Sequence, residues 1–195
     1  MRIRWVGDSR DYVKWDCVFE NQAGRFVFYV PMLRWKVDPS CKHRQVQDHF
    51  DQRKNLKQFG ELFPGRFSVF DFDGREYSRS VADAYFQSAI EEFQTLRQSH
   101  KVLVFIDPDT GIQPGGGAED EHLRKKDIRS VWEALKSGDK LIVYQHASRT
   151  NGWRENLLKH AAEVLKMELT QDKNLYFDER LARDVCFLVL EKSES

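Results

Sequence analysis

The segment Val102–Ile112, with the sequence VLVFIDPDTGI, constrains the fold of this chain more than any other segment. An apolar run ends at Ile106 and is followed at once by Asp107, Pro108, Asp109 and Thr110. In α/β proteins, a buried strand that stops abruptly at acidic and turn-forming residues presents chemistry at the carboxyl edge of a sheet. The glycine at 111 supplies the backbone freedom that such a loop needs. We therefore expect a functional site at the end of this strand.

Strand and helix patterns alternate along the chain. Strands are expected at 2–6, 26–33, 67–70, 102–106, 141–144, 167–177 and 185–190, and helices from Asp8 or Ser9 through Phe19 and at 45–63, 81–96, 124–136 and 153–166. Apolar strands separated by amphipathic helices indicate βαβ units and a mostly parallel sheet that is covered on both faces. The last two strands have no helix between them, which predicts an antiparallel hairpin at one edge. We expect a single α/β domain over residues 1–195.

Composition bounds the class of protein. Lys plus Arg and Asp plus Glu both total 31, so no global field attracts nucleic acid or an anionic membrane. The three cysteines are odd in number and widely spaced, which suits a reducing compartment. The N-terminal sequence lacks the apolar core of a signal peptide, and no apolar run approaches membrane-spanning length. The expectation is a cytoplasmic protein without membrane contact, whose oligomeric state the sequence leaves open.

A second strand end strengthens the site. Tyr144, Gln145 and His146 end the next apolar strand, so they should lie beside Asp107 at the same sheet edge. Tyr144 could stack on a planar substrate, and His146 could move a proton or bind substrate, although a hydrogen-bonded surface histidine is the alternative. Lys14 could reach the same site, with a surface lysine as the simpler interpretation. The candidate catalytic residues are Asp107, Pro108, Asp109, Tyr144 and His146.

A family resemblance follows from these residues. The last ninety residues resemble the second half of an S-adenosylmethionine-dependent methyltransferase, with an acidic-proline strand end, a helix, a strand, a helix and an antiparallel hairpin. Asp107-Pro108 is similar to the start of the Asp-Pro-Pro-aromatic motif of methyltransferases that act on amino groups of nucleic-acid bases. The resemblance implies a Rossmann-like fold, S-adenosylmethionine as cofactor, and an acceptor amino group oriented by Asp107.

The chain departs from that family in two places. Asp109 and Thr110 replace the second proline and the aromatic residue of the motif. The strand at 26–33 runs into Arg34 and Trp35 instead of a Gly-x-Gly loop, so no cofactor-binding residue is assigned. A divergent, non-catalytic binding or scaffold domain of the same fold is therefore the main alternative.

A metal-dependent enzyme is a further alternative. Two carboxylates at Asp107 and Asp109 could converge on Mg²⁺, as in a phosphodiesterase or nuclease. The pair resembles the Asp-x-Asp of the TOPRIM fold, which also requires a glutamate at the end of an earlier strand. Glu20 is the only early glutamate, and we expect it at a helix end. The segment 70–74, FDFDG, resembles the first motif of haloacid-dehalogenase-type phosphatases but is best explained as a strand-to-loop transition.

Two further segments carry functional hypotheses. Residues 34–58 hold seven Lys or Arg against three Asp, with Trp35, His43 and His49 interleaved. This pattern suits contact with a nucleic acid, or simply a solvated helix face. The polar, glycine-rich loop at 113–121 could cover the pocket as a lid or be a disordered insertion.

Overall fold

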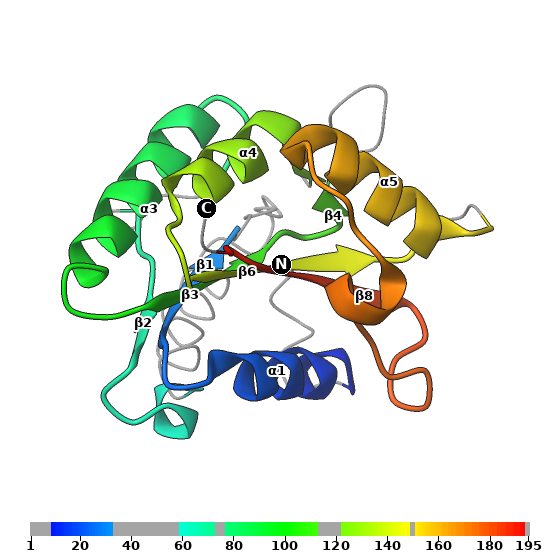
Figure 1. Cartoon of the computed structure of the whole chain (residues 1–195), viewed down its shortest axis with the longest axis horizontal. Coiled ribbons are helices and arrows are strands. Elements are labelled where there is room, and N and C mark those ends of the chain that lie inside the picture. The colour runs from blue at the N-terminus through cyan, green and yellow to red at the C-terminus, as the bar shows by residue number, and fades with distance from the viewer. Residues whose placement is uncertain (1–8, 33–58, 73–76, 113–121, 149–150, 194–195) are drawn as a thin grey trace, which may run out of the picture.

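The structure, a computed structural model, describes residues 9–32, 59–72, 77–112, 122–148 and 151–193 (Figure 1). The helices are α1 (Ser9–Gln22), the 3-10 helix η2 (Phe59–Leu62), α3 (Ala82–Leu96), α4 (Lys125–Ala134), α5 (Trp153–Leu165) and α6 (Gln171–Asn174). The strands of the main sheet are β1 (Phe26–Pro31), β2 (Phe67–Val69), β3 (Val102–Asp107), β6 (Lys140–His146), β7 (Leu175–Tyr176) and β8 (Val185–Glu191). A separate two-stranded pair is formed by β4 (Gly111–Ile112) and β5 (His122–Leu123).

The main sheet confirms the expected α/β class with a mostly parallel sheet. Its strand order is β2-β1-β3-β6-β8-β7, and β2, β1, β3 and β6 are parallel to one another. β8 is antiparallel to both β6 and β7, so the expected antiparallel pair forms the end of the sheet, with β8 inside and β7 at the edge. The pattern is Rossmann-like, and the order in which strands are added to the sheet reverses between β1 and β3.

The two faces of the sheet carry different elements. α1 lies on one face and α3, α4 and α5 lie on the other (Figure 1). Alternate residues of β3 divide between them, so Val104 and Ile106 join the core under α3 to α5, whereas Leu103 and Phe105 join the core under α1. Because successive side chains of a strand alternate between faces, Asp107 points to the α1 face.

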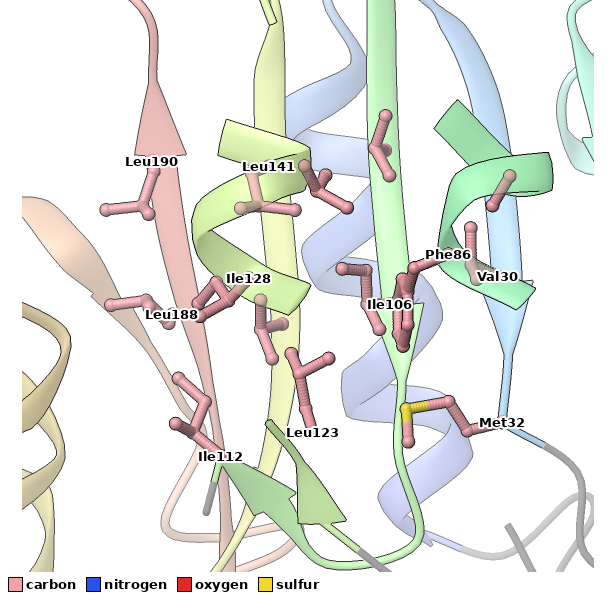
Figure 2. Close-up of a cluster of buried hydrophobic side chains, with 14 of the residues drawn as sticks. Val30, Met32, Phe86, Ile106, Ile112, Leu123, Ile128, Leu141, Leu188 and Leu190 are labelled. Carbon is pink, nitrogen blue, oxygen red and sulfur yellow. The ribbon is translucent and has the colours of Figure 1, made fainter. Parts of the chain in front are cut away.

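The two cores differ in chemistry. The core under α3 to α5 is mainly aliphatic near the middle of the sheet, where Ile106, Leu141 and Leu188 lie on the neighbouring strands β3, β6 and β8 (Figure 2). The core under α1 is largely aromatic, and the Trp15 ring lies 5.3 Å from Tyr29 and 6.0 Å from Phe105 between centroids, both edge-on. Edge-to-face packing of this kind adds to the burial of apolar area and fixes the angle at which α1 lies on the sheet.

Most predicted elements lie within two residues of the observed ones. The main difference is the predicted strand at 167–177, of which only Leu175–Tyr176 pairs with the sheet, because the short helix α6 occupies Gln171–Asn174. The predicted strand at 2–6 lies outside the described residues, and of the predicted helix at 45–63 only η2 lies within them. Within the described ranges, none of the helices has the length and apolar character that crossing a membrane requires.

Gly111 provides a test of how the loop after β3 is held. Its φ is +117°, and a Cβ there would lie 2.3 Å from Gln145 Oε1. Gln145 Oε1 accepts the Ile112 N–H at 2.9 Å, so this side chain cannot move without losing that bond. We expect Gly111→Ala to lower the free energy of unfolding by about 2–4 kcal/mol, from backbone strain together with the lost contact.

The matched control is Gly65→Ala. Gly65 has a φ of +67°, and a Cβ there would meet nothing within 4 Å, so only backbone strain of about 1–2 kcal/mol is expected. Urea denaturation of both variants measures the difference. An equal loss in the two variants would show that the Gln145 contact does not hold the loop.

Candidate functional site

Asp107 is the buried centre of the predicted site. It ends β3 with a residue exposure of 1%, and its Oδ2 accepts hydrogen bonds from two other elements. The Tyr29 hydroxyl of β1 donates at 2.6 Å, and the Lys14 ammonium of α1 donates at 2.9 Å. The strand end that the sequence predicted as a site is therefore joined to the neighbouring strand and to the helix that covers it.

Lys14 carries a second ion pair. Its Nζ lies 2.9 Å from Asp11 Oδ1, one helical turn earlier, and Lys14 is itself only 4% exposed. Burial would lower the pKa of Lys14, but the carboxylates of Asp107 and Asp11 outweigh it, so the pKa is raised. Burial, reinforced by Asp107, raises the pKa of Tyr29 well above its ordinary value. At neutral pH the ammonium is charged and the phenol keeps its proton.

Tyr144 lies on the same face of the sheet, at the next strand. The Lys14 Nζ is 5.5 Å from the centroid of its ring, and the Phe187 ring packs edge-on against it at 5.7 Å. Tyr144 is buried, so its ring forms part of the aromatic core under α1. The structure thus places Tyr144 beside Lys14 and Asp107, as expected from the parallel pairing of β3 and β6.

His146 lies at the end of β6 and belongs to a second ionic group. Its Nε2 lies 3.3 Å from Asp184 Oδ2, and its Nδ1 lies 3.2 Å from the Ala147 carbonyl oxygen. The Arg10 Nε donates to both carboxylate oxygens of Asp184 at 3.1 Å. Arg10 holds the pKa of Asp184 below its usual range. Both ring nitrogens of His146 therefore lie beside oxygen atoms that can accept a hydrogen bond.

The loop between β3 and β4 is bonded to the end of β6. The His146 N–H donates to the Thr110 carbonyl at 3.1 Å, and Gln145 Nε2 donates to the same oxygen at 3.2 Å. Pro108 is buried in this loop, whereas Asp109 is partly exposed. The five predicted site residues therefore share one edge of the sheet, but Asp107, Pro108 and Tyr144 are buried and Asp109 and His146 face solvent in part.

Sequence reasoning missed several members of these groups. For Lys14 the sequence left two interpretations, contact with the site or a surface position; the contact is confirmed and the surface interpretation was wrong, because α1 buries Lys14 against the sheet. Asp11, Lys14, Trp15 and Val18 follow the i, i+3, i+4, i+7 spacing of a buried helical stripe, a signal that could have identified Lys14. Tyr29, Arg10 and Asp184 carry no such local signal, because strand pairing brings Tyr29 and Asp184 to the site and the packing of α1 on the sheet brings Arg10 there.

Asp71 is a further acidic residue at the same edge. It follows β2 by two positions and is exposed, between the buried rings of Phe70 and Phe72. Burial raises the pKa of Glu92, and the negative charge of Asp71 adds to the shift. Asp71 thus places an exposed carboxylate just after β2, the edge strand that pairs with β1.

The alternative metal site receives little geometric support. In the part of the chain that the structure describes, no group of three or more His, Cys, Asp or Glu side chains is arranged to hold a metal ion. The Lys14 ammonium lies 2.9 Å from Asp107 Oδ2, and a positive charge in this position repels a cation. The basic segment 34–58 and the loop 113–121 lie outside the described residues.

Comparison with known proteins gives no match: no family model, no curated protein and no solved structure is similar to this chain.

Lys14→Met tests the buried ion pair. Removing the ammonium leaves the carboxylate of Asp107 buried without its cation, so we expect a loss of about 3–5 kcal/mol in the free energy of unfolding. The control is Lys126→Met, since Lys126 Nζ pairs with Asp83 at 2.6 Å with a side-chain exposure of 59%. That exposed pair should leave stability nearly unchanged. Similar effects in both variants would contradict a structural role for the buried pair.

The raised pKa of Tyr29 predicts how the free energy of unfolding depends on pH in the alkaline range. Its raised pKa means that the unfolded chain loses the phenolic proton first, so stability is present below about pH 10 and falls as pH rises further. Tyr29→Phe should make the fall between about pH 10 and 12 shallower by up to 1.4 kcal/mol per pH unit. Urea denaturation across this range measures the slope. Tyr12→Phe, at an exposed position, should leave the slope as in the wild type.

Proposed function

We propose that this chain is an S-adenosylmethionine-dependent methyltransferase whose pocket lies at the carboxyl ends of β1, β3 and β6. The observation that carries the proposal is the position of Asp107-Pro108 at the end of β3, beside the point where the strand order reverses. Ligands of open α/β sheets bind at such switch points. The helix, strand, helix and antiparallel pair that follow are in the order of the methyltransferase resemblance.

Asp71 suits the cofactor in this arrangement. In doubly wound folds, an acidic side chain near the end of the second strand accepts a hydrogen bond from a ribose hydroxyl. Asp71 is exposed just after β2, and the residues that directly follow β1 lie outside the described part of the chain. When bound, S-adenosylmethionine would supply an electrophilic methyl group next to the end of β3.

The buried residues and the partly exposed residues at this edge would have different roles. Asp107 is bonded to Lys14 and Tyr29, so it would hold the end of β3 in place. It would also determine the charge at that strand end. Asp109 and His146, which are partly exposed, would contact the acceptor. Methyl transfer depends on positioning more than on a strong base, and this suits a histidine held by Asp184. An amino group of a nucleic-acid base is the acceptor that the Asp-Pro resemblance favours.

A non-catalytic binding domain of the same fold is the second candidate. The observation that favours it is the burial of Asp107, because a carboxylate with 1% exposure that is already paired with an ammonium reaches an acceptor group only after rearrangement. Under this proposal the fold would persist without methyl transfer. A Mg²⁺-dependent phosphodiesterase would need Asp107 to exchange Lys14 for a metal ion.

Calorimetric titration with S-adenosylmethionine tests the proposal. Binding is expected to stabilise the fold by about 2.7 kcal/mol at a hundredfold excess over the dissociation constant. Asp71→Asn should weaken binding about tenfold or more, through the lost charged hydrogen bond. Asp172→Asn, at an exposed position in α6, is the matched control and should bind as the wild type does.

Methyl transfer to nucleosides and oligonucleotides, followed by mass spectrometry, then separates the two candidates. Transfer that is lost in His146→Ala, with cofactor binding retained, would support the enzyme. Binding without transfer to any acceptor would favour the non-catalytic domain. The absence of binding at about 1 mM ligand, a limit near 4 kcal/mol of affinity, would overturn the methyltransferase and leave the non-catalytic domain.

A further inference from the structure

We propose that the outer face of α1 is a docking surface for a basic, amphipathic helical segment of a partner protein. The surface faces away from the sheet, so the proposal is independent of the pocket at the strand ends. We call it the α1 surface, and it consists of Tyr12, Asp16, Phe19, Glu20, Glu61 and Leu62.

The α1 surface gathers exposed apolar side chains. Tyr12 is 70% exposed, Phe19 55% and Leu62 48%, and together they are three of the four large hydrophobic side chains exposed among the described residues. The Phe19 ring lies 6.2 Å from that of Phe63, which joins the end of α1 to η2. Figure 1 shows η2 beside the carboxyl end of α1. Scattered apolar residues need no explanation, but a group on neighbouring elements is typical of a binding surface.

The spacing of these side chains fits a helical ligand. Tyr12 and Phe19 are seven positions apart, which puts them on one face of α1 about 10 Å from each other. Two turns of a partner helix span the same distance, so apolar residues spaced i, i+3 and i+7 could contact both rings. Aromatic residues are also the side chains that contribute most to binding at protein interfaces.

The charges of the α1 surface indicate that the partner is positively charged. Among the exposed residues of α1, the only charged ones are Asp16 and Glu20, and Glu61 lies beside Leu62 on η2. Asp16 accepts a hydrogen bond from the Tyr176 hydroxyl, and burial followed by the charges of Asp16 and Glu20 raises the pKa of Tyr176. These three carboxylates around an apolar centre complement Lys and Arg.

The basic residues of α1 do not offset these acids. Arg10 is paired with Asp184, and Lys14 is paired with Asp11 and Asp107 beneath the helix. Lys and Arg side chains of a partner could lay their methylene groups over Tyr12 and Phe19 while their charged ends meet the carboxylates. We therefore assign the surface to a basic amphipathic helix rather than to an acidic one.

The experiment uses two synthetic helical peptides of about five turns with the same leucine face, one with lysine and one with glutamate on the polar face. Fluorescence anisotropy with the full chain should show micromolar binding of the lysine peptide, which weakens as salt rises, and no binding of the glutamate peptide. The double variant Tyr12→Ser/Phe19→Ser should lose at least about tenfold in affinity for the lysine peptide.

Two further variants make the test specific. Leu181→Ser removes an apolar side chain that is 54% exposed outside the α1 surface, and it should leave binding unchanged. Glu20→Lys/Glu61→Lys should weaken the lysine peptide and allow the glutamate peptide to bind, since the surface charge is then reversed. Circular dichroism and thermal melting confirm that each variant is folded.

Three results would overturn the proposal. The first is the absence of lysine-peptide binding to the wild type up to about 1 mM. The second is binding that persists in the folded Tyr12→Ser/Phe19→Ser variant. The third is self-association of the wild type in sedimentation velocity that disappears in the same variant, which would assign the α1 surface to a second copy of the chain.

Discussion

The ion pair between Lys14 and Asp107 connects the elements on which the rest of the site depends. It joins α1 to the end of β3, and the Tyr29 hydroxyl extends the connection to β1. Taking both charges out of water is costly, and the cost is offset only when geometry and further hydrogen bonds are good. Asp11 and Tyr29 supply those further partners. The same ion pair therefore determines both how α1 packs on the sheet and where the end of β3 lies.

This pair divides the strand-end chemistry into a buried part and an accessible part. Asp107 and Tyr144 lie under α1, where an ammonium and aromatic rings surround them. His146 lies at the same edge, half exposed and oriented by Asp184, which Arg10 holds in turn. A ligand at the point where the strand order reverses would contact His146 and Asp184 directly. Asp107 and Tyr144 would affect it only through their charge and through the rigidity of the buried part. This division separates the buried groups that position the strand end from the groups that face solvent.

Sequence patterns predicted the fold well because the physics that forms each element is local. The apolar run before Asp107 and the helical period of 81–96 depend on neighbours within the segment, and both elements lie where they were expected. The electrostatic partners are different, since Asp184 reaches His146 only because β8 pairs antiparallel with β6. Lys14 is the intermediate case: it lies in a helical stripe of buried residues, but lysine is so commonly exposed that the stripe alone does not predict its burial.

The burial of Lys14 also determines the outer charge of α1. The whole chain has equal numbers of acidic and basic residues, so it carries no large net charge. Equal numbers of acidic and basic residues in the whole chain do not make every part of its surface neutral, because charges that are paired inside the fold no longer act at the surface. Arg10 and Lys14 are both paired with carboxylates, so the exposed charges of α1, Asp16 and Glu20, are acidic. The ion pair that positions the end of β3 thus keeps the charge of Lys14 away from the outer face of α1, where the exposed charged residues are acidic. This is why α1 contributes both to the strand-end site and to the α1 surface.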